Sequence, residues 1–502
     1  MPADWMRRTT LGLMLVAVAC GVGLRVQAFA RGPSFWIDEA MLALNVVHKP
    51  IPELLRPLDL NQGAPVGYLV ASKLMLRAFG DSEASFRAIS LAAGLAALLI
   101  FARFTHAALP EGAARLGTSL FAVSPYLVSY SAEFKQYELD AAFAIGLLHA
   151  ARPVWLGTAT VGRQLWLAAA GVLAVWFSHP AVFVLAGAGV AVGLEALRTG
   201  ERRVIAGRLA IGAAWAASFA VCWLGFTRKL GMNQYLLDYW AGQFAPLPPT
   251  RPGDFAWIAH HCLELFDKPG GFASSEFGAG GLAAFCWCLG VVALRNDERP
   301  LLVALTLPLL LVFLASGLQK YPFAGRLMLF VVPLLLVPVA RGAAVLAERV
   351  RGLSPALPPL VVGLLLLPGV AECWWHAKVP LHAEEAREVV RDLEALHRPG
   401  EPVYVYYGAV PAFAYYAWPG PIAREDVTLG VENRGGDARR FRDELRPLLP
   451  AGRVWVVLAH RQKAEEAAIR ADLDANGDCT EVARRADAML LRYDARPPCP
   501  RH

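Results

Sequence analysis

Residues 9–40 read TTLGLMLVAVACGVGLRVQAFARGPSFWIDEA, a long apolar run followed by two adjacent carboxylates, Asp38 and Glu39. An apolar helix of about 20 residues is long enough to cross a bilayer. Arg7 and Arg8 precede the run, as basic residues precede a cleavable signal, but the run is long and no clear small-x-small cleavage site follows it. We therefore interpret residues 9–29 as a membrane anchor, with the acidic pair just outside the bilayer.

The rest of the chain has the same apolar character. Hydrophobic residues make up 56% of its 502 residues and charged residues 18%, whereas about a quarter of the residues of a typical soluble protein are charged. A count of 8 Cys in a chain of this length excludes a small disulfide-stapled scaffold. The arginines are scattered between apolar stretches and form no basic face, which argues against a nucleic-acid partner. The composition indicates an integral membrane protein whose natural partners are lipids.

We predict about eleven membrane-spanning helices, joined by loops with a strong charge bias. The spans cover residues 9–29, 86–104, 116–130, 137–156, 164–177, 181–197, 205–226, 279–294, 301–317, 326–340 and 356–372. With a cytoplasmic N-terminus, most loop arginines fall on the cytoplasmic side, as the positive-inside rule requires. Arg228 and Lys229, in a long outer loop, are the main exception. An odd number of spans places the C-terminal tail outside the cell, or in the periplasm, of a multi-pass plasma (inner) membrane protein.

The chain divides into two parts by composition. Residues 1–374 form a predicted transmembrane module with long external loops at 30–85 and 227–277, and residues 375–502 have the composition of an external soluble domain. Within the second part we predict helices at 384–397 and 462–473 and strands at 402–407, 453–459 and 488–493, an α/β pattern. Cys479 and Cys499 share this domain, and their spacing leaves a disulfide open. The predicted fold class is mainly α, a helical bundle with a C-terminal α/β domain.

The acidic pair in Phe35-Trp36-Ile37-Asp38-Glu39-Ala40 is the sharpest local feature. Carboxylates at a membrane interface are costly to bury without a role. One of them suits a general base, and its neighbour suits orienting a substrate or binding a metal. The alternative is a helix cap, in which Asp38 and Glu39 favour the start of a helix at Ala40.

A second cluster lies in the short outer turn Ser131–Asp140, which carries Glu133, Lys135 and Tyr137. A lysine between two carboxylates suits binding a phosphate, with Tyr137 as a hydroxyl donor. The alternative is an interfacial lysine beside an aromatic-belt tyrosine.

A third cluster is Gln319-Lys320-Tyr321-Pro322-Phe323-Ala324-Gly325-Arg326, on the predicted outer face. Arg326 opens a span against the charge bias of the other loops, which suits gripping an anionic headgroup, although an interfacial ion pair is the alternative. His179, in another outer turn, either borders the same cavity or packs as a cap. A divalent metal site here would need Asp38, Glu39 or His179, and spacing leaves metal dependence open.

Taken together, these segments resemble the polytopic glycosyltransferases of the protein O-mannosyltransferase and aminoarabinose transferase type, which have the C-type glycosyltransferase fold. The resemblance covers roughly residues 10–340. It is carried by the pair Asp38-Glu39, by Pro65-Val66-Gly67-Tyr68, by Phe86-Arg87, by the Ser131–Tyr137 turn, and by Tyr321-Pro322-Phe323 with Gly325-Arg326.

The resemblance implies that Asp38 is the catalytic base, assisted by Glu39, and that the cation of the second outer loop binds the phosphate of a polyprenyl-phosphate sugar. The expected function is inverting transfer of a monosaccharide from that donor to an acceptor glycan, lipid or protein. We expect Lys135, Arg326, Tyr137 and Tyr321 to bind the donor phosphate. Glu133, Tyr68, His179 and Lys320 are further candidates for substrate contacts. A lipid-linked glycan flippase and a non-catalytic assembly subunit remain the alternatives.

Overall fold

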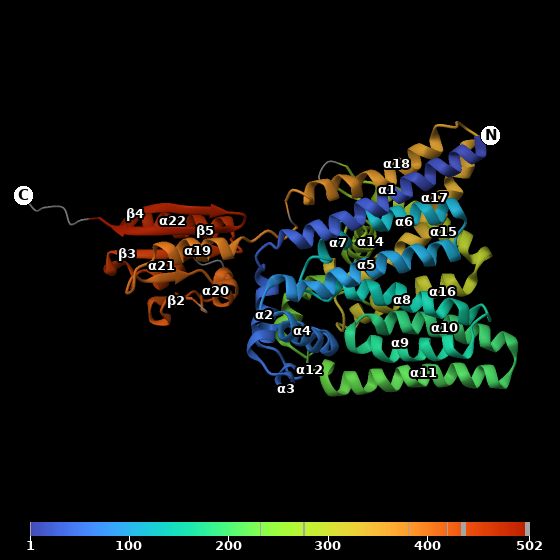
Figure 1. Ribbon diagram of the computed structural model, residues 1–502, viewed down its shortest axis with the longest axis horizontal. Helices are drawn as coiled ribbons and strands as arrows, with labels where there is room; N and C mark the ends of the chain where they lie inside the picture. The colour runs from blue at the N-terminus through green and yellow to red at the C-terminus, as the bar shows by residue number, and fades with distance from the viewer. Residues whose placement is uncertain are drawn as a thin grey trace, which may run out of the picture.

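The computed structural model describes residues 2–496 apart from 231, 275–276, 380, 419 and 433–437, and the side chains of residues 10–496 within the same limits and apart from 438. Cys499, whose pairing with Cys479 the sequence leaves open, lies outside these residues. Figure 1 shows two parts: a bundle of long helices, and a sheet domain at the end of the bundle opposite the N-terminus.

The bundle consists of long apolar helices that match the predicted spans. They are α1 (Pro2–Arg31), α5 (Glu83–Ala108), α6 (Glu111–Ala122), α7 (Pro125–Tyr130), α8 (Tyr137–Trp155), α9 (Val161–Phe177), α10 (Ala181–Thr199), α11 (Arg202–Cys222), α15 (Gly280–Asp297), α16 (Arg299–Gly317), α17 (Val332–Arg351) and α18 (Leu357–His376). The third predicted span is wrong as a continuous helix, because it is divided between α6 and α7. Pro125 has no N–H to donate to the preceding turn, and it starts a new helix instead.

Seven helical stretches among the described residues are long and apolar enough to cross a membrane. They are Thr10–Arg31, Glu83–Ala108, Ala181–Thr199, Arg202–Leu230, Arg299–Gly317, Gly325–Arg351 and Leu357–His376. Helix α9 is apolar but shorter. The chain is thus an integral membrane protein, while the number of eleven spans stays a prediction.

Small residues allow two of these helices to pack very closely. A Cβ on Gly342 of α17 would lie 1.7 Å from the carbonyl oxygen of Cys286 in α15, and one on Gly290 of α15 would lie 1.8 Å from that of Pro338 in α17. Both distances are far inside van der Waals contact, so only glycine fits. Close approach through small residues is a common way for membrane helices to associate.

The first long loop folds into short helices beside the sheet domain (Figure 1). These are α2 (Ile37–His48), α3 (Ile51–Leu54), the 3-10 turn η1 (Asp59–Asn61) and α4 (Val66–Phe79). The second long loop, from residue 227, contains α12 (Arg228–Leu230), α13 (Gln234–Tyr239), η3 (Ala241–Gln243) and α14 (Pro252–Asp267), after the π-helical turn η2 (Trp223–Thr227). Both long loops are therefore folded into short helices, and α14 of the second loop packs against α15 of the bundle.

The C-terminal domain is a mixed five-stranded sheet with helices. Its strands are β1 (Val403–Val405), β2 (Val427–Leu429), β3 (Arg453–Ala459), β4 (Gly477–Arg485) and β5 (Ala488–Ala495). The strand order is β2-β1-β3-β5-β4; β1 pairs in parallel with β2 and β3, whereas β5 pairs antiparallel with β3 and β4. The helices are α19 (Ala386–Leu396), α20 (Val410–Ala417), α21 (Ala438–Leu445) and α22 (Lys463–Asn476), with short turns η5 (Tyr407–Ala409), η6 (Arg424–Asp426) and η7 (Leu449–Ala451).

One apolar core joins the sheet domain to the first loop. Phe35 and Leu42 from the loop belong to the same buried cluster as Val389 of α19 and Phe413 of α20. Burial of this kind stabilises an interface in proportion to the apolar area removed from water. The sheet domain therefore packs directly on the segment that carries the acidic pair.

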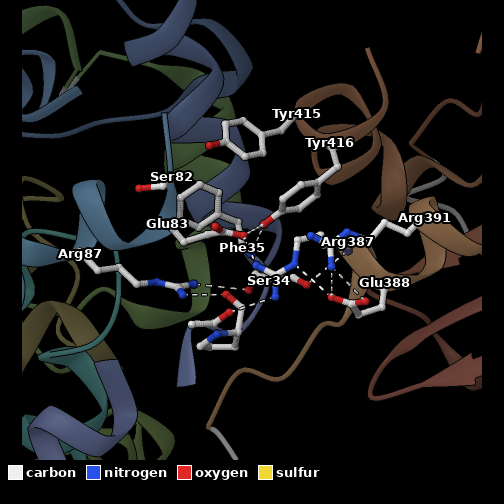
Figure 2. Close-up of polar contacts among 12 residues, drawn as sticks. Ser34, Phe35, Ser82, Glu83, Arg87, Arg387, Glu388, Arg391, Tyr415 and Tyr416 are labelled. Carbon is white, nitrogen blue, oxygen red and sulfur yellow. Dashed lines mark hydrogen bonds and ion pairs between the residues drawn. The ribbon is translucent and has the colours of Figure 1, made fainter. Parts of the chain in front are cut away.

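Polar contacts border this core, and Figure 2 shows them. The Tyr416 hydroxyl donates to Glu83 at 2.8 Å and accepts from the Phe35 backbone N–H at 2.7 Å. Arg387 forms an ion pair with Glu83 at 2.6 Å and donates to the carbonyl oxygen of Gly32 at 3.1 Å. Glu83 is thus shared by two side chains of the sheet domain.

Candidate active site

Asp38 and Arg326 form an ion pair between α2 and the 3-10 turn η4 (Gly325–Val331), although 288 residues separate them. Both side chains are about four-fifths buried, at 20% and 19% exposed. The Arg326 guanidinium carbon also lies 5.1 Å from the ring centroid of Trp36 and 5.9 Å from that of Tyr137. Three of the predicted site residues, Asp38, Arg326 and Tyr137, therefore meet.

Glu39 points away from Asp38, into the protein. Its two carboxylate oxygens accept from the Arg87 guanidinium at 2.9 and 2.6 Å, from the Phe134 backbone N–H at 2.5 Å and from the Trp36 backbone N–H at 3.4 Å. The side chains of Glu39 and Arg87 are 1% and 2% exposed. This buried pair ties α2 to α5 and to the second outer turn, so it fixes where Asp38 and Lys135 lie relative to each other.

Lys135 is a buried cation with a neutral partner. It is 4% exposed, and its ammonium donates to the side-chain oxygen of Gln62 at 2.9 Å. Among the residues that the structure describes, no carboxylate forms an ion pair with it. A buried charge is stable only when it is paired or bound to a ligand of opposite charge. The site therefore presents a cation suited to an anion.

Charges converge on Asp38 from several elements. Burial alone would raise the pKa of Asp38, but the positive charges of Lys135, Arg326, His460 and His382 outweigh burial and hold the pKa below its ordinary value. Burial lowers the pKa of the Lys135 ammonium, and the negative charge of Asp38 opposes that effect only in part. Asp38 and Lys135 thus act on each other across the same site.

The linker that leads to the sheet domain closes another side of the site. The His382 ring stacks on the Trp36 ring, with centroids 4.3 Å apart and planes 12° from parallel, and its Nδ1 lies 2.6 Å from a carboxylate oxygen of Glu133. Burial would lower the pKa of His382, but the charge of Glu133 and its hydrogen bond raise it above its ordinary value. Trp36 thus contacts both His382 and Arg326.

The remaining predicted residues lie at different distances from this centre. The Tyr321 hydroxyl donates to the carbonyl oxygen of Leu327 at 2.9 Å, within its own loop. Tyr68 is fully buried, with its ring 5.8 Å from that of Phe134. His179 lies in the turn between α9 and α10, and Lys320 is exposed. The structure places none of these four in a described contact with Asp38.

Asp38, Glu39 and His179 do not form a group of metal ligands in the described part of the chain. Two other groups bring three histidine or carboxylate atoms within 4.8 Å of one another: His260, His261 and Glu264, and Glu384, His460 and Asp487. In the second group, His460 Nδ1 and Glu384 bond to each other at 2.6 Å. Asp487 accepts from the Arg461 backbone N–H at 3.4 Å, so each of the three side chains has a partner and we do not assign the cluster to a metal.

A small cavity of about 50 Å³ lies between α1, α7 and α18. Trp36, Glu39, Glu133 and His382 line it, together with apolar side chains such as Leu24. Trp36 therefore borders both this cavity and the ion pair of Asp38 with Arg326.

Several site residues had no signal in the sequence. His382, Glu384 and His460 come from the linker and the sheet domain, where no motif marks them, and Gln62 lies in an irregular stretch of the first loop. Arg87 belongs to the Phe86-Arg87 motif, but the motif does not indicate which residue pairs with it. A signal for Arg87 was available, because an arginine in the first turns of a membrane span needs a carboxylate partner.

With these elements in place, the bundle, its structured outer loops and its small sheet domain define a membrane protein with the C-type glycosyltransferase fold. The chain is similar to ArnT from Cupriavidus metallidurans, with 12% identity over 98% of each chain and a TM-score of 0.53 in the apo state and 0.55 when ArnT is bound to undecaprenyl phosphate. It is also similar to the archaeal oligosaccharyltransferase AglB from Archaeoglobus fulgidus, solved in complex with an inhibitory peptide and a dolichol-phosphate. That match has 12% identity, covers 96% of this chain and 74% of that chain, and has a TM-score of 0.52. No family model matches the chain, and no curated protein matches it in sequence. The predicted resemblance in fold is confirmed.

Proposed function

We propose that this chain is a membrane glycosyltransferase that moves a monosaccharide from a polyprenyl-phosphate donor to an acceptor, with inversion at the anomeric carbon. The proposal is supported by the fold shared with ArnT and AglB, which have been solved with undecaprenyl phosphate and dolichol-phosphate respectively. The reaction takes place at the end of the bundle that carries the sheet domain, which the charge bias of the loops places outside the cell or in the periplasm. In this proposal residues 1–374 form the catalytic module, and residues 375–502 form the external domain.

The main observation that supports this proposal is the buried ammonium of Lys135. Its described partner is the neutral amide of Gln62, so an incoming phosphate gains a charge-assisted hydrogen bond without displacing a carboxylate. Arg326, which pairs with Asp38, offers a second cation. The phosphate of the donor carries one negative charge, and the departing polyprenyl phosphate carries two. A site with two cations and one carboxylate suits this increase in negative charge.

The reaction balances with these groups alone. Asp38 takes the proton from the acceptor hydroxyl or amine, and the acceptor atom forms a bond to the anomeric carbon. The bond between that carbon and the phosphate oxygen breaks on the opposite face, and its electron pair leaves with polyprenyl phosphate. Negative charge therefore develops on the phosphate, where Lys135 and Arg326 stabilise it.

Arg326 has two roles in this scheme. In the structure it pairs with Asp38, and with the other cations it keeps the pKa of that carboxylate low. A phosphate bound at Lys135 competes for the same guanidinium. When Arg326 turns toward the phosphate, Asp38 loses a positive neighbour and its affinity for a proton rises, which makes it a better base.

Glu39 has a different role from the one that the resemblance implied. Its oxygens are occupied by Arg87 and by two backbone N–H groups, so we assign it to positioning α2 rather than to proton transfer. Tyr137 lies beside Arg326 and suits orienting it. Tyr321, Tyr68, His179 and Lys320 remain more distant candidates for substrate contacts.

The test is sugar transfer by membranes that contain Asp38→Asn. A panel of radiolabelled undecaprenyl-phosphate-linked monosaccharides serves as donor, and label in acceptor material is counted. We expect a loss of at least about 100-fold, as for removal of a general base. The matched control is Asp59→Asn, which changes an exposed carboxylate of the same loop. Transfer by Asp38→Asn at the wild-type rate removes Asp38 from the base role, and flipping of a fluorescent lipid without transfer by the wild-type protein supports the transporter instead.

A further inference from the structure

The sheet domain holds the backbone of the segment that leads into Asp38. The Ile37 N–H donates to a carboxylate oxygen of Glu384 at 3.0 Å, and the Phe35 N–H donates to the Tyr416 hydroxyl at 2.7 Å. Figure 2 shows Tyr416 and Arg387 reaching this segment from the sheet domain. Ile37 is the first residue of α2, and Asp38 is the second.

Glu384 thus acts as the N-terminal cap of α2, although it lies 347 residues away. The first amides of a helix have no partner within the helix and need an acceptor from elsewhere. The side chain of Trp36, at the cap position, provides no capping hydrogen bond. A negative charge at this end of the helix is also favourable for the helix dipole.

Glu384 holds His460 with its other oxygen. The side chain of Glu384 is 6% exposed, and His460 Nδ1 lies 2.6 Å from it. His460 follows the last residue of β3 and has a φ of 51°, while Asp487, between β4 and β5, has a φ of 46°. Residues other than glycine adopt this left-handed region rarely and at a cost. The tight turn at the end of β3 therefore places the imidazole over Glu384 at the expense of backbone strain.

The charge of His460 reaches Asp38. The groups that act on Asp38 are Lys135 of the second outer turn, Arg326 of η4, His382 of the linker and His460 of the sheet domain. The groups that act on His460 are Glu384, Asp487 and Asp38, and the hydrogen bond to Glu384 raises the pKa of the imidazole most. When its imidazole carries a proton, His460 is therefore part of the field around Asp38.

We propose that Glu384 and His460 are positioning residues for Asp38: Glu384 fixes the first turn of α2, and His460 places a positive charge beside the carboxylate. The sheet domain is then a working part of the active site rather than an appendage. The inference rests on the proposed function of Asp38 for its catalytic half, while its structural half is independent of any activity.

The structural half is tested by hydrogen–deuterium exchange on the purified full-length protein. Glu384→Ala removes the acceptor for the Ile37 N–H, and we expect residues 35–40 to exchange about fivefold faster or more, as for a lost helix cap. Glu385→Ala, which changes the neighbouring carboxylate, is the control and leaves this exchange unchanged. Glu384→Gln keeps an oxygen for the cap, so we expect residues 35–40 of this variant to exchange at about the wild-type rate; exchange about fivefold faster in Glu384→Gln also overturns the cap, even where Glu384→Ala does not fold. Unchanged exchange of residues 35–40 in Glu384→Ala overturns the cap.

The catalytic half is tested by the pH dependence of transfer, with the radiolabelled donors described above. In His460→Gln we expect kcat to fall about tenfold or more, with little change in KM, because Glu384 loses its charged partner and no longer holds the start of α2, so that Asp38 is misplaced. The acid limb of the pH–rate profile moves to higher pH, because Asp38 has lost a positive neighbour. His460→Lys retains the charge and restores both. A wild-type rate and profile in His460→Gln overturns this role, and so does a rise in KM alone. Wild-type transfer by Asp38→Asn overturns the proposed function, and the exchange result stands apart from it.

Discussion

At the scale of single residues, Asp38 and Glu39 have different roles in the site, although they are adjacent in sequence. Successive residues of an α-helix point about 100° apart, so two neighbouring carboxylates at the start of α2 cannot face the same way. Glu39 faces Arg87 in the interior, and Asp38 faces Arg326. The sequence identified the pair as the important feature, but adjacency alone could not say which carboxylate is free for chemistry.

Lys135 gives the first prediction at this scale. Lys135→Gln removes the buried cation, so we expect the affinity for undecaprenyl phosphate to fall about tenfold or more, the effect of losing one charge-assisted hydrogen bond. Binding is measured by titration of the purified protein with undecaprenyl phosphate. Lys49→Gln, in the first loop, is the matched control because Lys49 pairs with Asp59 at the surface. Equal affinities in Lys135→Gln and wild type would show that the phosphate binds elsewhere.

At the scale of elements, the pair between Glu39 and Arg87 joins α2 to α5 beneath the site. A buried pair is strongly destabilising when one partner is removed, because the other charge is left without compensation. The Ser131–Tyr137 turn is tied to the same pair through the Phe134 N–H. Three segments that are distant in sequence therefore depend on one ion pair.

The second prediction follows from this pair. Arg87→Met should lower the free energy of unfolding by about 3–5 kcal/mol, measured by denaturant titration in detergent. The double variant Glu39→Gln with Arg87→Met should recover part of that loss, because no charge is left buried. A double variant as unstable as Arg87→Met alone would contradict this account of the pair.

The linker gives the third prediction, which concerns pH. The pKa of His382 is raised by Glu133 in the folded protein. Such a histidine stabilises the folded state fully below its unfolded pKa, and the contribution is lost as pH rises through the raised folded pKa. We expect the Tm of the wild type to fall, as the pH rises above about 6.5, by more than the Tm of His382→Gln. Parallel Tm curves for the two proteins would exclude this coupling.

The elements also show where sequence patterns succeed. Long apolar runs predicted the bundle helices, because length and hydrophobicity suffice for that signal. The break between α6 and α7 is visible in the sequence as Ser124-Pro125, but it lies within an apolar run that suggested a single span. In the sheet domain β1, β3 and β5 were predicted, since they are apolar, whereas the two edge strands, the short β2 and the polar β4, were not.

At the scale of the whole molecule, the sheet domain and the bundle share one site. The core that contains Phe35 and Phe413 crosses from the first loop to the sheet domain, and Glu384 bonds to the start of α2. No local pattern predicts a contact between residues 37 and 384, because such contacts depend on how two folded parts dock. The motifs predicted that Asp38, Lys135 and Arg326 belong to one site. They did not predict that residues of the sheet domain also belong to it.

The fourth prediction concerns topology. The loops α10–α11 and α17–α18 lie at the end of the bundle opposite the sheet domain (Figure 1), and they are rich in arginine. We expect a cysteine in place of exposed Arg398 to react with an impermeant thiol reagent in sealed right-side-out vesicles. A cysteine in place of Ser354, after α17, should react only after the vesicles are opened. The unsubstituted protein corrects for its native cysteines. The reverse pattern would place the site on the cytoplasmic side.

The most direct measurement of the central claim is a cryo-EM structure of the full-length protein with undecaprenyl phosphate. We predict density for the phosphate within hydrogen-bond distance of the Lys135 ammonium, with Arg326 turned from Asp38 toward the phosphate. Density for the phosphate in another region, with Lys135 still bonded to Gln62 and Arg326 to Asp38, would contradict the account.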